Sequence, residues 1–403
     1  MEITLKHKLF YFFPVLFCFC LPFGQNFGSL LIVGWAFVSF FNIEPAQLKE
    51  GLKNKNLQLL FLFFTVTLAS AIFSSNKAEA IFSVEIKLGL IFFPYLLFCF
   101  TWPQQILKRC VVAFVSGCFF ACLYLIARAF YYSLNGQPEY FFYTLFSDMI
   151  HASYFAMYLI SAIIFVLLFY HKWFSTQKTV MFSSYVFVAI FIVTVFLCSS
   201  KLGIISFFII MPLLILYKLK DRLNFKTILI LFLLVIGILV VARKLFPESF
   251  SRLNSLTTIS VAPDRTSSES TAVRILIWEQ AIQLIKTNFL FGIGVGDVND
   301  ALYEAYEQNG ITGALNHKLN AHNQFFQTFI GLGVVGIILL LVLTLGQLIK
   351  ALVKRNVLLF IFSLLIILNF LVESMLQTSA GILYFTFFFC LFNLTDQKKL
   401  VCE

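Results

Sequence analysis

Long apolar runs separated by short polar gaps dominate this chain of 403 residues. It is 60% hydrophobic and only 12% charged, whereas soluble domains average about 25% charged residues. A helix needs about 20 apolar residues to cross the hydrocarbon core of a bilayer. We therefore predict an all-α polytopic membrane protein with about 12 transmembrane helices. The predicted spans are 9–24, 27–43, 57–74, 81–100, 110–132, 151–170, 180–198, 202–217, 227–246, 322–349, 357–372 and 375–394.

The basic residues in the gaps alternate between the two sides of this predicted bundle. If the N-terminus lies inside, the short outer gaps hold only Lys77 and Lys201. The short inner gaps hold eighteen: Lys6, Lys8, Lys49, Lys53, Lys55, Lys108, Arg109, Lys172, Lys178, Lys218, Lys220, Arg222, Lys226, Lys350, Lys354, Arg355, Lys398 and Lys399. Basic loops favour the cytoplasmic side, so we predict that both termini are cytoplasmic. This bias accounts for the net charge of +10, and no basic stripe interleaved with exposed aromatics argues for nucleic acid.

The topology divides the chain into three predicted parts. Residues 1–246 hold spans 1–9, residues 247–320 form a long periplasmic loop, and residues 321–403 hold spans 10–12 and a short cytoplasmic tail. Within the loop we predict an irregular stretch over Ser249–Ser270, a helix over Ala272–Asn288 and a second short helix over Val298–Gln308. Residues Ile275, Trp278, Ile282, Ile285 and Phe289 recur at helical spacing along the first of these helices.

The first loop helix carries an arginine that is suited to bind an anion. Arg274 and Trp278 lie one turn apart and can face the same way. A guanidinium presents a planar fork of donors that fits phosphate oxygens. The alternative is a surface salt bridge to Glu269 or Glu279, and Trp278 is more simply explained as a packed residue.

A histidine begins the tenth predicted span. His322 lies in the string Asn320-Ala321-His322-Asn323-Gln324, where the span would meet the outer interface. An imidazole can act as a general base near neutral pH. An ordinary interfacial histidine is the alternative.

Other polar residues are predicted at the same outer interface. Lys201 follows Ser199-Ser200 in a tight turn, where a cation is costly unless it reaches water or an anion, although it can also snorkel to water. His151 and Tyr154 begin the sixth span, and Glu373 stands at the last outer turn. The topology thus gathers six titratable side chains at one face: Arg128, His151, Lys201, Arg274, His322 and Glu373.

Two glycine patterns and the cysteines argue against nucleotide or metal chemistry. The string from Gly331 to Gly336 matches GxGxxG, but it lies in an apolar span without a βαβ unit, so close helix packing is the better explanation. The string from Gly292 to Gly296 is predicted to be a turn that positions the loop helix. No CxxC pair and no acidic cluster has metal-ligand spacing, so we expect no metal and no cofactor.

These residues resemble the bacterial O-antigen ligase and O-antigen polymerase superfamily. The resemblance rests on Arg274 and Trp278, on the G-x-G turn at Gly292-Ile293-Gly294, on His322-Asn323 with Gln327, and on Gly333 and Gly336 entering the span. Ser200-Lys201 resembles the Ser-Arg turn of that family, and His151-Ala152-Ser153-Tyr154 resembles an upstream His-x-x-Tyr element. Lys201 replaces the usual arginine, and Gly331 stands where many members have an acid.

The resemblance implies a membrane glycosyltransferase in the bacterial inner membrane with its active site on the periplasmic face. Such an enzyme takes a glycan from an undecaprenyl-pyrophosphate carrier and transfers it to an acceptor hydroxyl, without a metal. In the ligase branch the acceptor is the lipid A core, and in the polymerase branch it is another carrier-linked glycan. His322 would be the base, and Arg274, Lys201 and Arg128 would bind pyrophosphate. The residues expected to line the acceptor path are His151, Tyr154, Trp278, Asn323 and Glu373.

A transporter or flippase is the alternative from another functional class. Transporters usually show ionisable or broken-helix sites near the bilayer midplane, often in paired repeats. No repeat is evident here, and the unusual residues cluster at one predicted face. Lys87, with Glu85, in the fourth span is the main exception.

Overall fold

The computed structural model describes residues 5–103, 105–173, 178–220, 224–254, 264–267 and 271–394, and these residues form helices and turns without a strand. The chain divides into two compact units. Among the described residues, unit 1 contains those from 5 to 38 and from 102 to 254, and unit 2 contains those from 39 to 101 and from 264 to 394. Unit 2 therefore combines an early segment of the chain, residues 39–101, with the late part of the chain.

The helices of unit 1 are α1 (Leu5–Cys20), η1 (Leu21–Phe23), α2 (Gln25–Ser39), α7 (Ile106–Leu134), η3 (Pro138–Phe141), α8 (Tyr143–Phe146), α9 (Ala152–Trp173), α10 (Lys178–Leu197), α11 (Lys201–Lys218), α12 (Phe225–Leu245) and α13 (Pro247–Asn254). The last residue of α2 already belongs to unit 2. Helix α9 packs against α7, α10 and α11, and its middle is almost wholly buried.

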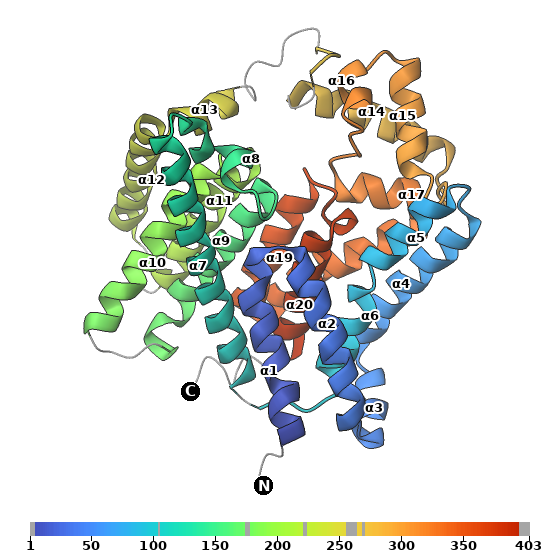
Figure 1. The fold of residues 1–403 in the computed structure, drawn as a ribbon, viewed down its shortest axis with the longest axis horizontal. Helices are drawn as coiled ribbons and strands as arrows, with labels where there is room; N and C mark the ends of the chain where they lie inside the picture. Colours follow the sequence, from blue (N-terminus) through green and yellow to red (C-terminus); the bar gives the residue numbers. More distant parts are fainter. Residues whose placement is uncertain are drawn as a thin grey trace. The chain divides into compact units, whose positions relative to one another are not determined.

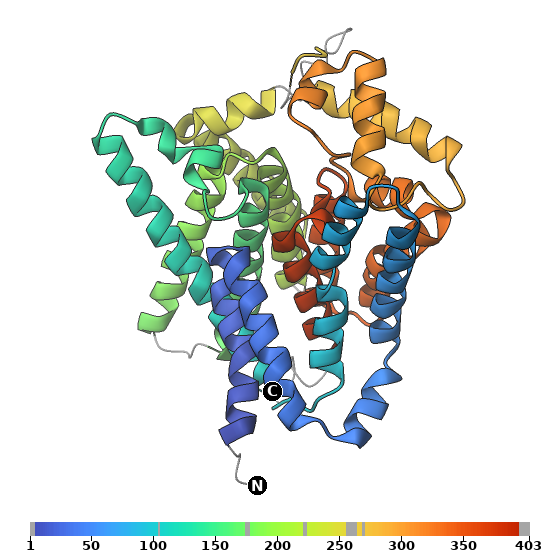
Figure 2. The same cartoon turned by 45° about the vertical axis from the view of Figure 1, so that its right-hand side comes forward.

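The helices of unit 2 are η2 (Phe40–Asn42), α3 (Pro45–Leu52), α4 (Lys55–Phe73), α5 (Lys77–Ile86), α6 (Gly89–Phe98), α14 (Thr271–Thr287), α15 (Val298–Gln308), α16 (Thr312–Asn316), α17 (Gln324–Leu341), the π-helical turn η5 (Val342–Gly346), α18 (Gln347–Val353), α19 (Val357–Phe370), η6 (Met375–Gln377) and α20 (Ser379–Leu394). Helix α17 packs against α4 and α14, and α14, α15 and α16 lie together at one end of α4, α5 and α17 (Figures 1 and 2).

Each of the twelve predicted spans contains helix. Among the described residues, seven helical segments are long and apolar enough to cross a membrane: Lys6–Phe23, Lys55–Phe73, Lys77–Phe98, Ile106–Leu134, Ala152–Phe169, Lys201–Lys218 and Gln324–Val353. Shorter apolar helices cover Phe27–Asn42, Ser184–Leu197, Val357–Phe370 and Ser379–Leu394. An all-helical, multi-pass membrane protein is thus confirmed over these residues. The total of 12 spans and their orientation remain predictions.

Short polar residues define where many of these helices begin. The side-chain oxygen of Asn54 accepts hydrogen bonds from backbone amides in the first turn of α4, and those of Asn76, Ser200, Asn323 and Asn356 do the same for α5, α11, α17 and α19. Such caps satisfy amides that have no partner within the helix and contribute about 1 kcal/mol each. The capping residue therefore sets where an apolar helix begins, which the apolar sequence of the helix does not do by itself.

The predicted loop helices are confirmed, with two errors. Helix α14 follows the predicted Ala272–Asn288 within one residue at each end, and α15 has the predicted bounds. The irregular stretch is wrong at its start, because α13 is helical to Asn254; residues 255–263 and 268–270 lie outside the described residues.

Most of the residues that recur at helical spacing along α14 are not the ones that form its buried face. Ile285 is buried, but Ile282 and Phe289 are exposed, and the buried face instead includes Val273, Ile277 and Ala281. Both faces of the helix are rich in apolar residues, so helical spacing alone did not identify the buried one.

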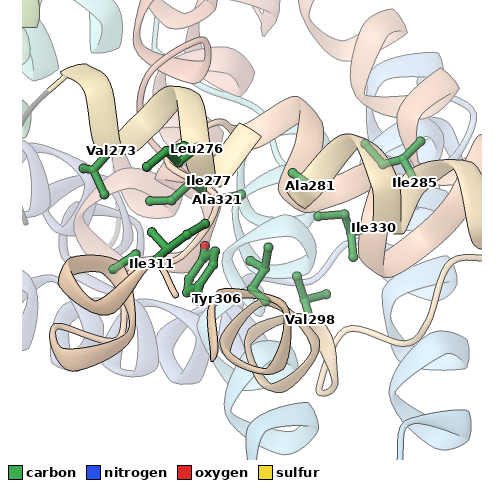
Figure 3. Close-up of a cluster of buried hydrophobic side chains, with 12 residues drawn as sticks. Val273, Leu276, Ile277, Ala281, Ile285, Val298, Tyr306, Ile311, Ala321 and Ile330 are labelled. Atoms are coloured by element: carbon green, nitrogen blue, oxygen red, sulfur yellow. The ribbon is translucent and has the colours of Figure 1, made fainter. Parts of the chain in front are cut away.

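The loop helices enclose a hydrophobic core of their own in unit 2. It contains Val273, Leu276, Ile277, Ala281, Ile285, Val298, Leu302, Tyr306, Ile311, Ala314, Ala321 and Ile330 (Figure 3). Burial raises the pKa of Tyr306, so its hydroxyl stays neutral within this packing. Ala321 lies just before the membrane helix α17 and Ile330 lies within its first two turns, so the core joins the loop to that helix.

Helix α17 is interrupted at Gly333, which has φ of 61° and ψ of −156°. The prediction of one continuous helix over 322–349 is wrong at this point. The carbonyls of Ile330 and Gly331 accept hydrogen bonds from the amides of Ile293 and Gly294, at 2.8 and 3.2 Å. In return, the amide of Val334 donates to the carbonyl of Phe289 at 3.0 Å. The two glycine patterns of the sequence thus pair with each other: Gly292–Gly296 forms the predicted turn, and the close packing at Gly331 and Gly333 is to the backbone of that turn.

Side chains from helix α4 complete this junction. The hydroxyl of Ser70 donates to the carbonyl of Gly331 at 3.1 Å and accepts from the amide of Val295 at 3.0 Å. Ser74 accepts from the amide of Gly296 at 3.0 Å. The carboxylate of Asp297 accepts from the amides of Ser75 and Asn76, at 2.8 and 2.7 Å. The loop, α4 and α17 are therefore held together by hydrogen bonds between segments more than 200 residues apart in sequence.

We predict that Gly333→Ala destabilises unit 2 by about 1–3 kcal/mol, because glycine tolerates the positive φ at this position and an alanine there would be strained. A Cβ at Gly333 would also lie 2.3 Å from the carbonyl oxygen of Leu290. The matched control is Gly237→Ala, because nothing lies within 4 Å of a Cβ there. Thermal unfolding of the purified protein in detergent measures both variants; an equal melting temperature for Gly333→Ala and the wild type would contradict the prediction.

Candidate functional site

Glu373 is the centre of the polar cluster in unit 2. It lies in the turn between α19 and η6, and its side chain is only 10% exposed. Its Oε1 is 3.4 Å from Nη2 of Arg274, and its Oε2 is 3.5 Å from Nδ1 of His322. One carboxylate therefore contacts both the predicted anion-binding residue and the predicted base.

Arg274 reaches this cluster from the first turn of α14. Its side chain is 30% exposed, so it is not fully enclosed by the protein. The N-terminus of a helix has partial positive charge, which adds to the charge of the guanidinium. The structure pairs Arg274 with Glu373, not with Glu279 as the salt-bridge alternative proposed; Glu269 lies outside the described residues.

His322 has a strained backbone. Its φ is 43°, in the left-handed region that non-glycine residues seldom adopt. The amide of His322 donates to Oδ1 of Asn320 at 2.9 Å. Its Nδ1 is buried and makes no hydrogen bond within the described part of the chain, while the ring as a whole is 23% exposed. Backbone strain of this kind is often found at functional sites.

Amide side chains fix the two segments that carry Glu373 and His322. Asn323 caps α17 with its Oδ1, and its Nδ2 donates to the carbonyl of Leu371 at 3.1 Å. The Oε1 of Gln324 accepts from the amide of Leu376 at 2.6 Å. These bonds span the turn on both sides of Glu373. Asn323 therefore positions backbone beside the site, and the residue is only 6% exposed; its role in lining an acceptor path stays a prediction.

Trp278 supports the backbone next to His322. Its Nε1 donates to the carbonyl of Ala321 at 3.0 Å, and its ring packs edge-on against Phe326. The amide of Ala321 in turn donates to Oε1 of Gln327 at 3.1 Å. This agrees with the view of Trp278 as a packed residue that holds the backbone next to His322.

A buried lysine contacts Gln377, in the short helix η6 that follows the Glu373 turn. Lys87 lies at the break between α5 and α6, so the predicted fourth span is also interrupted. Its Nζ donates to the hydroxyl of Ser83 at 2.8 Å and to Oε1 of Gln377 at 3.2 Å. A small cavity of about 10 Å³ lies here, between Lys87, Gln327, Thr328 and Gln377. The sequence marked Lys87 only as an exception, because nothing in its own surroundings indicates the contact with Gln377.

The other predicted residues belong to unit 1. The hydroxyl of Ser200, the cap of α11, donates to that of Ser153 near the start of α9 at 3.2 Å. This bond brings together the helix ends that carry Lys201 and His151. Tyr154 is buried and packs against the exposed His151 ring, with centroids 5.9 Å apart.

Arg128 holds a loop in unit 1. Its Nη1 is 2.5 Å from Oδ2 of Asp148, and its Nη2 donates to the carbonyls of Leu145 and Phe146. Its guanidinium also lies 5.7 Å from the centre of the Tyr140 ring. Much of its donor capacity is thus used within the protein. The predicted gathering of all six titratable residues at one face remains a prediction, because each unit is described by itself.

Comparison with known proteins finds one family. Residues 185–341 match the O-antigen ligase family. These residues form an O-antigen ligase domain. The match supports membership of the O-antigen ligase and polymerase superfamily, and it includes Lys201, Arg274 and His322. No curated protein matches the chain.

The O-antigen ligase family implies a membrane glycosyltransferase-like enzyme that acts on lipid-linked glycans. Glu373 lies beyond the matched residues, and only the fold brings it to Arg274 and His322. The sequence signal for Glu373 was its position at a predicted outer turn. Within the described residues, no three His, Cys, Asp or Glu side chains are arranged to hold a metal ion.

We predict that Glu373→Gln lowers the rate of glycan transfer about 10- to 100-fold, the loss that follows removal of a group that orients a functional histidine in comparable sites. The amide keeps the volume of the side chain but not its charge. Glu279→Gln, on the exposed face of the same α14 that carries Arg274, is the control and should leave transfer unchanged. Transfer is measured in membranes at equal protein level; wild-type activity in Glu373→Gln would contradict the prediction.

Proposed function

We propose that this O-antigen ligase domain transfers a glycan from a polyprenyl-pyrophosphate carrier to the hydroxyl of an acceptor, in the manner of an O-antigen ligase. The observation that carries the proposal is the contact of Glu373 with both Arg274 and His322. It joins a cation suited to a diphosphate and an imidazole suited to remove a proton, in a partly exposed cluster.

Arg274 stabilises the leaving group in this proposal. The acceptor oxygen bonds to the anomeric carbon of the sugar, and the bond from that carbon to the pyrophosphate oxygen breaks. Negative charge then grows on the departing diphosphate, and a fixed cation that faces it lowers the barrier. A guanidinium has five N–H donors, so contact with Glu373 through Nη2 leaves others for phosphate oxygens.

His322 takes the proton of the acceptor hydroxyl. A carboxylate beside Nδ1 favours the tautomer with its proton on that nitrogen, and Nε2 is then able to accept one. When the hydroxyl attacks, the imidazole becomes a cation, and the charge of Glu373 stabilises it. The separation of 3.5 Å between Glu373 and Nδ1 is long for a hydrogen bond, and catalytic contacts often tighten when substrate binds.

For the residues of unit 1, the proposal keeps the roles that the family resemblance implies. Lys201, at the start of α11, is assigned to the diphosphate, and His151 with Tyr154 is assigned to the acceptor path. Arg128 is a weaker candidate than the sequence indicated, because Asp148 and two carbonyls already engage it. We assign the protein to the bacterial inner membrane with this cluster on the periplasmic side, as the distribution of basic loops predicts.

A polymerase of the same superfamily is the second candidate, since the match to residues 185–341 does not distinguish the ligase branch from the polymerase branch. Deletion of the gene followed by gel analysis of lipopolysaccharide separates them. Core without attached chains, together with accumulated carrier-linked polymer, indicates a ligase. Core with a single repeat unit indicates a polymerase. An unchanged lipopolysaccharide pattern would refute both assignments for this glycan.

We predict that His322→Ala abolishes transfer, with a loss of at least about 100-fold, the contribution expected of a general base. The control is His317→Ala, because His317 lies exposed at the end of α16 in the same unit. Both variants are compared by glycan transfer in a strain that lacks the native gene. Full transfer by His322→Ala would remove the base assignment.

We predict that Arg274→Lys is much weaker than the wild type, because an ammonium lacks the fork that binds two phosphate oxygens at once. The expected loss is about 10-fold or more, in line with a loss of roughly 1.4 kcal/mol or more in the transition state. Lys286→Arg, at the other end of α14, is the reciprocal control and should be silent. Equal rates for Arg274→Lys and the wild type would favour a purely structural ion pair with Glu373.

A further inference from the structure

The segment after α14 is strongly apolar and exposed. Phe289, Leu290 and Phe291 are 50%, 60% and 85% exposed. They lie in the part of the chain that the sequence assigned to a water-facing loop. An exposed cluster of large apolar side chains in water is unfavourable by about 25 cal/mol for each Å² of apolar surface. Such a cluster therefore indicates a contact surface.

Backbone hydrogen bonds fix the position of this segment relative to a membrane helix. The amide of Val334 lies 3.0 Å from the carbonyl of Phe289 and 3.2 Å from that of Leu290. The ring of Phe289 also contacts that of Phe329, with centroids 5.2 Å apart. The segment therefore lies beside α17 at the level of its interruption at Gly333.

The helix itself indicates where the hydrocarbon begins. The apolar segment Gln324–Val353 has 30 residues, which is about 45 Å of helix and longer than the roughly 30 Å core of a bilayer. Its part from Val334 to Val353 is about 20 residues, close to 30 Å. Lys354 and Arg355 follow at once, and such residues usually mark an interface. Gly333 thus lies near the opposite boundary of the hydrocarbon.

A stripe of exposed apolar residues runs along this part of the helix. Val335, Ile338, Val342, Leu345, Ile349 and Leu352 are all exposed. They recur at steps of three and four residues, which places them on one face. In a membrane-spanning helix, an apolar exposed stripe of this length faces lipid. The exposed segment 289–291 adjoins the end of this stripe through its bonds to Val334.

We propose that Phe289, Leu290 and Phe291 insert into the bilayer at its interface, so that this segment of the loop contacts the acyl chains of bulk lipid. Two aromatic rings at this depth match the preference of amphipathic and aromatic side chains for the boundary region. The segment continues the lipid-facing stripe of α17 and α18. Its polar backbone is compatible with this depth because the carbonyls of Phe289 and Leu290 are paired with Val334.

A basic residue lies beside the apolar segment. Lys286, one turn before Phe289 and Leu290, is exposed, and a lysine near an interface can extend to phosphate head groups while its stem covers apolar surface. The last turn of α14 then carries one basic residue, and the apolar segment follows directly after the helix. That arrangement is typical of helices that rest on a lipid surface.

Photo-crosslinking tests the proposal. The photoreactive residue p-benzoylphenylalanine replaces Phe291 or, in a second variant, Leu290, and the full chain is reconstituted into vesicles of phosphatidylethanolamine and phosphatidylglycerol. The same residue at Ile338, on the lipid-facing stripe, is the positive control. The same residue at Glu307, exposed on α15 of the same loop, is the negative control. Intact-mass spectrometry after irradiation measures the gain of one phospholipid.

The expected result is a phospholipid adduct at 291, 290 and 338 and none at 307. Absence of the adduct at both 290 and 291, while 338 reacts, would overturn the proposal. A covalent dimer at 291 would also overturn it, because the surface would then bind a second copy. A third contrary outcome is an adduct that forms only after polyprenyl phosphate is added, which would assign the surface to the carrier and not to bulk lipid.

Discussion

The backbone pairing between the Gly292–Gly294 turn and the interruption of α17 supports the rest of unit 2. A break in a membrane helix leaves peptide groups without partners, and each unpaired group in an apolar environment costs several kcal/mol. Here the amides of Ile293 and Gly294 satisfy the carbonyls of Ile330 and Gly331. Because α14 precedes this turn, the pairing also fixes the helix that carries Arg274 relative to the helix that begins beside His322.

The positions of the polar site residues depend on this backbone pairing. His322 precedes α17, Arg274 begins α14, and Glu373 lies in a turn close to the end of the chain. Buried amide side chains, chiefly those of Asn323 and Gln324, bind the backbone of the Glu373 turn to the start of α17. Hydrogen bonds in a low-dielectric interior are strong and directional, so the carboxylate is held where it contacts both partners. A carboxylate in such an interior interacts more strongly with a neighbouring charge than it would in water.

Residue patterns predicted the bounds of the loop helices well, but they did not predict which helix faces are buried or where helices are interrupted. The bounds of α14 and α15 followed from apolar spacing, Gly punctuation and helix length. The buried face of α14 did not, because Ile282 and Phe289 are apolar yet exposed. A hydrophobic pattern reports a preference to leave water and does not distinguish a protein core from lipid. The interruptions at Lys87 and Gly333 were missed for a related reason, since a continuous apolar run gives no sign that another segment will satisfy a broken helix.

The sequence by itself determined the helical, multi-pass class of the protein, the approximate limits of its helices and the choice of Arg274, His322 and Glu373 as candidates. These depend on hydropathy, on charge and on the chemistry of single side chains, which are local properties. Only the tertiary structure decided that Glu373 contacts both other residues and that two glycine strings pair with each other. It likewise revealed that Arg128 is engaged by Asp148. Each of these facts joins segments distant along the chain, and no local pattern contains the distance between them.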